Sequence, residues 1–458
     1  MSIRSAVCYS LSLNSQDVLA HLRLIEPFHL AGINIIDGIV NNQPDYEAVL
    51  KGDIVVIQRD FPRMFEDYQS IVKIAKQEKK PIVFDLDDLL FCLPENHPAR
   101  ESQHYVSSFI PMFQALRDAD MITVSTRKLK EILDQYHNNV VVLPNFFLDA
   151  LWQLRPPVKK HLKNEVLTIG YMGGNTHEAD LEYIAPVLLN IAERYPGRVN
   201  FHFLGMEPHE KLRFLDQATW TTQYLHSYKN FVSFFKNQSI DIFIAPLLDN
   251  IFNRCKSPIK FFDYSALGAT GVFSHIEPYL EIVEHEKNGL LAASLDEWME
   301  GLVNLIENHD LRYMLATNAQ ATIRAKYLMS KNAFRWQETF QFLSNLSIDK
   351  RNEDSVNILA AVNTQISQAL NKDQQQIQLL NTRLQEQEKL TQATAHQLNA
   401  TAHQLNEITT SKAWRFATAI RRVRVVLFPP GSWRSRLVSK MLILPMSLFK
   451  KYIRSSNG

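Results

Sequence analysis

The most constraining feature of this 458-residue chain is a strand, loop, helix and strand pattern packed into residues 241–291. The two strands of this pattern are short and apolar, at residues 241–245 and 270–274, and the loop and helix lie between them. Between them, Ser257 is a residue type that caps helices and Gly268 one that ends them. Consecutive strands joined by a helix form a βαβ unit, so the sequence predicts a parallel sheet with helices on its faces.

The loop between the first strand and the helix is the candidate binding site. Ligands of parallel sheets bind where strand carboxyl ends meet helix amino ends. Arg254, Lys256 and Ser257 lie at the expected helix start, where unpaired N–H groups favour an anion such as a phosphate. Lys260 shares a helix face with Lys256, and Asp263 follows three residues later. The alternative is an ordinary surface loop before a solvated helix.

The segment NRCKSPIKFFDYSALGATGVFS, preceded by DIFIAPL and followed by NGLL, resembles the nucleotide-sugar site of GT-B glycosyltransferases of family 4. In that family a carboxylate on this helix holds the nucleotide ribose, and Asp263 occupies the matching position. A second carboxylate, eight residues earlier, usually contacts the donor sugar, but Cys255 stands there. The family also places an Arg/Lys pair in this loop, which Arg254 and Lys256 match most nearly. Lys256 and Lys260 would then stabilise the departing diphosphate.

The resemblance extends over residues 1 to about 345 and implies two Rossmann-like doubly wound domains that face a cleft. We expect an acceptor domain at 1–150, a linker at 151–164, and a donor domain at 165–347 whose last helix returns to the first domain. The expected strands of the acceptor domain are residues 6–11, 33–36, 53–58, 81–84, 121–124 and 140–143.

A glycine turn opens the donor domain directly after its first strand pattern. Gly173 and Gly174 lack side chains, so their backbone N–H groups can approach a diphosphate closely, and Asn175 follows them. A plain tight turn is the alternative. The position of this turn in the first βα unit of the domain favours a role in donor binding.

Acceptor-side candidates lie in the first domain. Asp85, Asp87 and Asp88 follow a buried strand pattern in PIVFDLDDLLF. They form either a metal site of the DxD type or an acidic turn. The GT-B layout favours the turn, because enzymes with that layout usually need no metal. We therefore predict no metal site and no cofactor besides the nucleotide-diphosphate sugar substrate. His97 and Arg59 are further candidates for contact with an acceptor, and the alternative for each is an ordinary loop residue.

Charge is distributed unevenly along the chain. Residues 408–458 hold eleven Lys or Arg and no Asp or Glu, which leaves 38 basic and 48 acidic residues elsewhere, a net charge of −10. The three cysteines have no metal-ligand spacing and fit a reducing compartment. The amino terminus has no sustained apolar run and reads as a first strand, not a signal peptide.

Residues 350–410 are rich in Gln, Asn, Thr and Leu and carry a heptad pattern. One seam position contains Leu370, Ile377 and Leu384, and TAHQLNA at 394–400 recurs as TAHQLN at 401–406. This predicts a coiled coil of roughly 80 Å at about 1.5 Å per residue, through which the chain would pair with itself or with a partner protein. The alternative is a single solvated helix, because the seam contains several polar residues.

Residues 411–458 form a basic amphipathic tail. Phe416, Ile420, Val423 and Leu427 lie on one helical face, and residues 437, 441, 444 and 448 lie on another after the Pro-Pro break. An apolar stripe with cationic flanks is typical of a helix in an anionic membrane interface. Nucleic-acid binding is disfavoured because nothing earlier resembles a base-reading module.

Together these features predict a retaining, metal-independent glycosyltransferase of hexosyltransferase type. It would transfer sugar from a nucleotide sugar to a carbohydrate or lipid-linked acceptor in bacterial cell-surface polysaccharide synthesis. Its expected location is the cytoplasm, peripherally on the inner face of the plasma membrane. The main alternative is a catalytically degenerate scaffold that recruits partners to the membrane through its coiled coil, which Cys255 favours slightly. An epimerase of GT-B fold fits the long helix less well.

Overall fold

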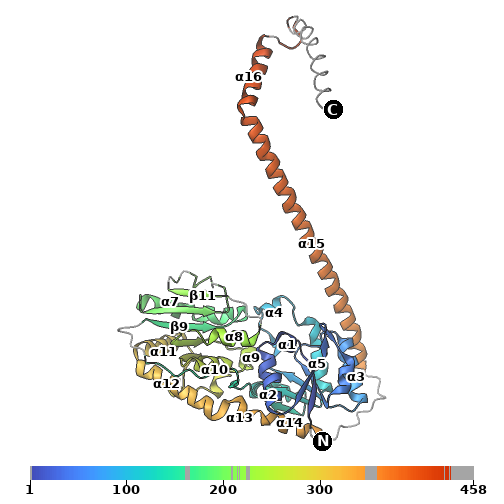
Figure 1. Cartoon of the computed structure of the whole chain (residues 1–458), viewed down its shortest axis with the longest axis vertical. Coiled ribbons are helices and arrows are strands. Elements are labelled where there is room, and N and C mark those ends of the chain that lie inside the picture. Colours follow the sequence, from blue (N-terminus) through green and yellow to red (C-terminus); the bar gives the residue numbers. More distant parts are fainter. Residues whose placement is uncertain are drawn as a thin grey trace, which may run out of the picture. The chain divides into compact units, whose positions relative to one another are not determined.

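The computed structural model describes residues 3–159, 166–207, 210–213, 215, 217–222, 227–345, 358–427, 429–432 and 434 (Figure 1). The chain divides into two compact units, Met1–Asn371 and Lys372–Gly458. The first unit contains two α/β domains, and the second is mainly helical.

The N-terminal domain is built on a six-stranded sheet in which all neighbouring strands are parallel. In sheet order the strands are β2 (Asn34–Asp37), β1 (Ser5–Tyr9), β5 (Ile54–Gln58), β6 (Ile82–Leu86), β7 (Met121–Val124) and β8 (Val140–Val142). A small antiparallel hairpin pairs β3 (Ile39–Val40) with β4 (Gln43–Pro44). The sequence predicted all six sheet strands, with ends displaced by at most two residues.

Helices connect these strands. They are α1 (Leu11–Ser15), α2 (Glu26–Leu30), α3 (Phe65–Gln77), α4 (Pro98–Glu101), α5 (Phe109–Asp118) and α6 (Arg127–Leu133), with the short helices η1 (Ala20–Ile25), η2 (Tyr46–Lys51), η3 (Leu90–Cys92) and η4 (Val106–Ser108). Burial of the central strands on both faces explains their mostly apolar sequences: every residue of β5, β6 and β7 is buried.

The C-terminal domain repeats this design. Its parallel strands, in sheet order, are β11 (Ala218–Thr221), β10 (Val199–Leu204), β9 (Leu167–Met172), β12 (Ile242–Ala245), β13 (Thr270–Ser274) and β14 (Leu290–Ala292). Chain order reverses direction between β9 and β12, which makes the ends of these two strands a topological switch point. The predicted pair of doubly wound domains is confirmed.

The helices of this domain include the two that matter for the site, α7 (Glu178–Arg194) and α10 (Ile259–Ala266). The others are η5 (Asn175–His177), α8 (Tyr228–Phe235), α9 (Ile251–Arg254), η6 (Tyr279–Glu281), α11 (Leu295–Glu307), α12 (His309–Thr322) and η7 (Ile323–Tyr327). The chain then runs through α13 (Met329–Asn332) and α14 (Phe334–Asn345).

Helix α14 packs on the N-terminal domain, so the two domains share apolar contacts away from the cleft. Phe340 meets Phe28 edge to face with ring centroids 5.5 Å apart, and Trp336 meets Phe146 at 6.2 Å. One continuous cluster of buried side chains includes residues of both domains. Edge-to-face aromatic pairs of this kind add about 0.5–1.5 kcal/mol each beyond their buried area.

The expected linker is ordered against the C-terminal domain where the structure describes it. The buried Trp152 donates from Nε1 to the Tyr228 hydroxyl at 3.0 Å. Arg155 donates from its backbone N to Ala266 and from Nε to Leu267, both at 2.8 Å. Residues 160–164 of the expected linker lie outside the described residues.

The second unit contains most of α15 (Ile358–Thr410) and all of α16 (Lys412–Leu427). The predicted long helix is confirmed, and Ile377, Leu384, Leu398 and Leu405 of its heptad pattern are exposed. Pairing through this stripe stays a prediction. Within the described residues no helix is long and apolar enough to cross a membrane. Seam residue 356 and the expected tail residues 433 and 435–458 lie outside the description.

Candidate functional site

A cleft of about 710 Å³ lies between the two α/β domains. Its walls come from the carboxyl ends of β9 and β12 on one side and of β5 and β6 on the other, which is where ligands of such sheets bind. It brings together most of the residues predicted from the sequence: Arg59, Asp87, Asp88, Gly173, Gly174, Lys256, Ser257, Lys260 and Asp263.

Lys260 is an unpaired cation in the first turn of α10. Its Nζ is buried and has no hydrogen-bond partner within the described residues, and it lies 4.8 Å from the centroid of the Tyr171 ring. Burial lowers the pKa of Lys260 to about 7, although Asp180 acts to raise it. A buried donor without an acceptor costs about 1–3 kcal/mol, so this position suits an anionic ligand.

Lys256 lies just before α10 and is held by a dyad that the sequence analysis missed. Its Nζ lies 3.4 Å from Nε2 of His177 and 4.9 Å from the centroid of the Phe252 ring. His177 Nδ1 lies 2.8 Å from Oδ2 of Asp180, in the first turn of α7. Because burial and the two lysines lower the pKa of His177 to about 3, its ring is neutral. It therefore donates from Nδ1 to Asp180 and accepts at Nε2 from Lys256.

The spacing of His177 and Asp180, three residues apart at a helix start, was the available sequence signal for this dyad. Asp180 also accepts from the backbone N of Leu248 at 2.7 Å and from Asn253 at 3.3 Å. Burial acts to raise the pKa of Asp180, but the hydrogen bonds from His177 and from the backbone of Leu248, with the nearby Lys260, lower it overall. The dyad thus also joins α7 to the loop after β12.

The glycine turn has the tight geometry that its sequence predicted. A Cβ on Gly173 would come within 2.5 Å of the Tyr171 hydroxyl, so a side chain is excluded there. Its backbone N donates to Leu204 at 3.0 Å, which leaves Gly174 as the more open edge of the turn. Asn175 begins η5, but its side chain lies outside the description.

Asp263 is buried on the cleft-facing side of α10 and is 3% exposed. Burial raises its pKa to about 8, against the opposing effect of Lys260. Both carboxyl and carboxylate forms accept hydrogen bonds from hydroxyl groups, so the position fits the predicted contact with a sugar.

On the N-terminal wall, Arg59 and Asp87 form an ion pair at 3.3 Å. Burial raises the pKa of Asp87 to about 7, although Arg59 lowers it. Asp85 lies behind them and is bound by Arg23, Gln58 and Thr123 rather than facing a ligand. Among the described residues, no group of three or more His, Cys, Asp or Glu is arranged to hold a metal ion.

Two predicted candidates lie away from this cleft. His97 lines a smaller neighbouring pocket of about 290 Å³ and packs edge to face on Phe252, with centroids 5.4 Å apart. Arg254 pairs with Asp249 at 2.5 Å and with Glu277 at 3.9 Å. The sequence placed Arg254 beside Lys256, but the four-residue helix α9 turns its side chain outward.

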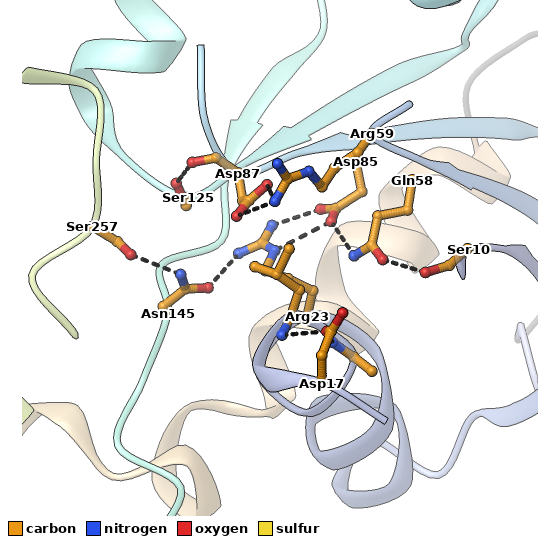
Figure 2. A network of polar contacts seen from close by, with 12 residues as sticks. Ser10, Asp17, Arg23, Gln58, Arg59, Asp85, Asp87, Ser125, Asn145 and Ser257 are labelled. Carbon is orange, nitrogen blue, oxygen red and sulfur yellow. Dashed lines mark hydrogen bonds and ion pairs between the residues drawn. The ribbon is translucent and has the colours of Figure 1, made fainter. Parts of the chain in front are cut away.

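The expectation that Ser257 caps α10 is wrong. Pro258 occupies the cap position, and no side chain caps the helix. The Ser257 hydroxyl instead accepts a 2.8 Å hydrogen bond from Nδ2 of Asn145, in the other domain (Figure 2). The helix begins one residue later than the sequence predicted, so Ser257 lies before the cap position.

Cys255 does not face the cleft. Its side chain is fully buried in an apolar cluster made mostly of N-terminal-domain residues, and its backbone O accepts from Oγ1 of Thr126 at 2.9 Å. The residue that stands where the resemblance expects a sugar-binding carboxylate therefore joins the domains instead.

The sequence matches no protein-family model and no curated protein. The fold, however, is similar to solved structures. Sucrose-phosphate synthase from Thermosynechococcus elongatus aligns with a TM-score of 0.54 and 11% identity over 74% of this chain and 99% of that one. HepE from Anabaena, in complex with UDP-glucose, aligns with a TM-score of 0.51 and 13% identity over 75% and 100%. The chain thus has the GT-B fold that the sequence predicted.

Proposed function

We propose that this protein is a glycosyltransferase that takes a sugar from a nucleotide diphosphate donor. The observation that carries the proposal is the buried, unpartnered ammonium of Lys260 in the cleft, close to Lys256 and the glycine turn. Two lysines beside a glycine turn, at a topological switch point, suit a diphosphate ligand. The complex of HepE with UDP-glucose, a protein of the same fold, supports this ligand class.

In the proposed reaction, Lys256 and Lys260 stabilise charge on the departing diphosphate, and Asp263 holds the nucleotide ribose. The bond between the anomeric carbon and the diphosphate oxygen breaks, and a bond from an acceptor hydroxyl to that carbon forms on the same face. The hydroxyl proton leaves on the diphosphate, so no protein base is required. Preorganised cations in a cleft of low dielectric supply most of the rate enhancement.

The N-terminal wall would receive the acceptor. Arg59, Asp87 and Asp88 face the donor lysines across the cleft and offer both donors and acceptors for sugar hydroxyl groups. We propose a hexose as the transferred sugar, a carbohydrate or lipid-linked acceptor, retained anomeric configuration, and no metal requirement.

We place this activity in bacterial cell-surface polysaccharide synthesis at the cytoplasmic face of the plasma membrane. Helix α16 supports the setting because its apolar residues, among them Trp414, Phe416 and Ile420, are exposed beside several arginines. The exposed heptad stripe of α15 supports self-association or pairing with a partner protein.

Ligand-induced thermal stabilisation of the full chain tests the proposal. UDP, GDP, ADP and their hexose conjugates would be compared with and without magnesium. A ligand at one hundred times its dissociation constant adds about 2.7 kcal/mol to the free energy of unfolding. We expect one base to stabilise the protein without magnesium and Lys256→Ala to remove the effect, whereas Lys229→Ala, at an exposed position on α8, leaves it intact.

The same experiment separates the enzyme from a scaffold. If no nucleotide stabilises the wild-type chain, the glycosyltransferase proposal fails. The catalytically degenerate scaffold that recruits partner proteins is then the better explanation. If a nucleotide binds, release of the free nucleoside diphosphate in the presence of candidate acceptors then measures turnover.

A further inference from the structure

The hydroxyl group of Ser257 is held from across the cleft. Asn145 follows β8 in the N-terminal domain and is 3% exposed, whereas Ser257 directly precedes the cap of α10 in the C-terminal domain. Their side chains meet at 2.8 Å (Figure 2). Ser257 lines the cleft together with Lys256 and Lys260.

The direction of this hydrogen bond is fixed by Arg23. Nη1 of Arg23 lies 3.2 Å from Oδ1 of Asn145, and a guanidinium group has donors but no acceptor. The amide oxygen of Asn145 must therefore face Arg23, and its NH₂ group must face Ser257. Oγ of Ser257 is consequently the acceptor, and its own hydrogen points elsewhere.

The side chain of Arg23 is held in place by an ion pair with Asp85. It is fully buried and pairs with Asp85 through Nη2 at 2.6 Å and Nε at 3.3 Å. Asp85 also accepts from Gln58 and Thr123 at 3.1 and 2.7 Å, so neither member of the ion pair is able to turn (Figure 2). The orientation of Asn145 thus follows from the N-terminal sheet, not from the donor domain.

The hydrogen of the Ser257 hydroxyl has no acceptor within hydrogen-bonding distance among the residues that the structure describes. The group does not cap α10, and its one contact uses it as an acceptor. A hydroxyl polarised by a donor on its oxygen becomes a better donor itself. In a cleft that also contains the unpartnered Lys260, the matching ligand atom is an anionic oxygen.

We propose that Asn145 is a positioning residue that turns the Ser257 hydroxyl into a directed hydrogen-bond donor to the donor diphosphate. This inference rests on the proposed function. Because the two residues belong to different domains, the contact exists only when the acceptor domain and α10 are in the arrangement seen here. Donor affinity then depends on a residue of the acceptor domain that does not touch the donor.

Asn145→Asp is the sharpest test because it preserves shape and replaces the amide donor by an acceptor. The new carboxylate would pair with Arg23 and take the Ser257 hydrogen for itself. We expect the dissociation constant of UDP, GDP or ADP, whichever the wild-type full chain binds, to rise roughly tenfold or more by calorimetry. Ser257→Ala should weaken binding by a similar factor.

The double variant separates positioning from simple charge repulsion. On the Ser257→Ala background, Asn145→Asp should lose most of its effect, because the hydroxyl through which it acts is gone. Asn237→Asp, the same chemical change at an exposed position beyond α8, should leave the dissociation constant unchanged. Melting temperatures of the free variants report folding, and Asn145→Ala replaces Asn145→Asp if the latter does not fold.

Failure of this inference differs from failure of the proposed function. If wild type binds a nucleoside diphosphate through Lys256 but Asn145→Asp weakens binding equally with and without Ser257, or not at all, the positioning role is overturned and the function stands. If the wild-type chain binds none of the three diphosphates, both are overturned.

Discussion

The ammonium of Lys260 lies 4.8 Å from the centroid of the Tyr171 ring and has no hydrogen-bond acceptor among the described residues. A ring face attracts a cation but does not replace water as a hydrogen-bond partner. The free protein therefore carries a destabilising group in its cleft, which is the arrangement expected of a binding site whose stability is completed by its ligand.

Lys260→Met should separate these two roles. Methionine keeps the apolar contact with Tyr171 and removes the buried charge, so we expect the free protein to gain about 1–3 kcal/mol in unfolding free energy. Stabilisation by nucleoside diphosphates should disappear at the same time. Chemical denaturation with and without UDP, GDP and ADP measures both effects, with the exposed Lys229→Met as the control. A less stable free variant would contradict the interpretation.

Diphosphate binding should also depend on pH through Lys260. In the free protein burial lowers the pKa of this lysine to about 7, so above that pH an anion binds only with uptake of a proton. Affinity should therefore fall as the pH rises from 7 to 9, by up to about tenfold per unit. Lys260→Arg stays charged over this range and should show a flatter profile. Parallel slopes for wild type and Lys260→Arg would exclude Lys260 as the titrating group.

The sequence predicted the fold well because the signals were local. Buried parallel strands such as β7 and β13 have short, mainly apolar patterns, and their predicted bounds match the structure. Lys260 and Asp263 were found because their helical spacing places them on one face of α10, whereas Lys256 precedes the helix and reaches the cleft from the loop. These residues meet in the cleft as the spacing implied.

The sequence failed where a side chain's partner comes from a distant segment. Ser257 reads as a helix cap, yet its partner is Asn145, 112 positions earlier. The role of His177 depends on Lys256, 79 positions later, and Arg254 turns to Asp249 because α9 ends beside it. No local pattern encodes the contacts of Ser257 and His177, since the first joins the two domains and the second joins two separate segments of the C-terminal domain. The pairing of Arg254 with Asp249 is local, five residues apart, and depends on where the short helix α9 ends.

Restoring the family's carboxylate at position 255 should damage the protein. The Cys255 side chain is buried among apolar N-terminal residues, so Cys255→Glu places an unpaired carboxylate there and should cost about 3 kcal/mol or more. Cys255→Ala should be milder. Thermal unfolding measures both, and higher transfer activity in Cys255→Glu would show that position 255 faces the sugar after all. Alkylation offers a check, since burial raises the pKa of Cys255 to about 12 while Cys92 is exposed.

Helix α16 should hold the protein on anionic membranes. Phe416, Ile420 and Val423 recur at helical spacing and are exposed, with Arg421 and Arg422 beside them. Each basic residue near an anionic surface contributes about 1 kcal/mol, and salt screens that attraction within about 10 Å at 0.1 M.

Cosedimentation with vesicles tests this expectation. The full chain should pellet with vesicles containing phosphatidylglycerol but not with pure phosphatidylcholine, and less at high salt. A chain ending at Thr410 should stay in the supernatant. Replacement of Phe416, Ile420 and Val423 by Ser should reduce vesicle binding more than the same change at three small or polar positions of α16. The reason is that burial of the apolar stripe anchors the helix after charge has brought it to the membrane surface. Equal sedimentation of the full and shortened chains would show that the tail has no such role.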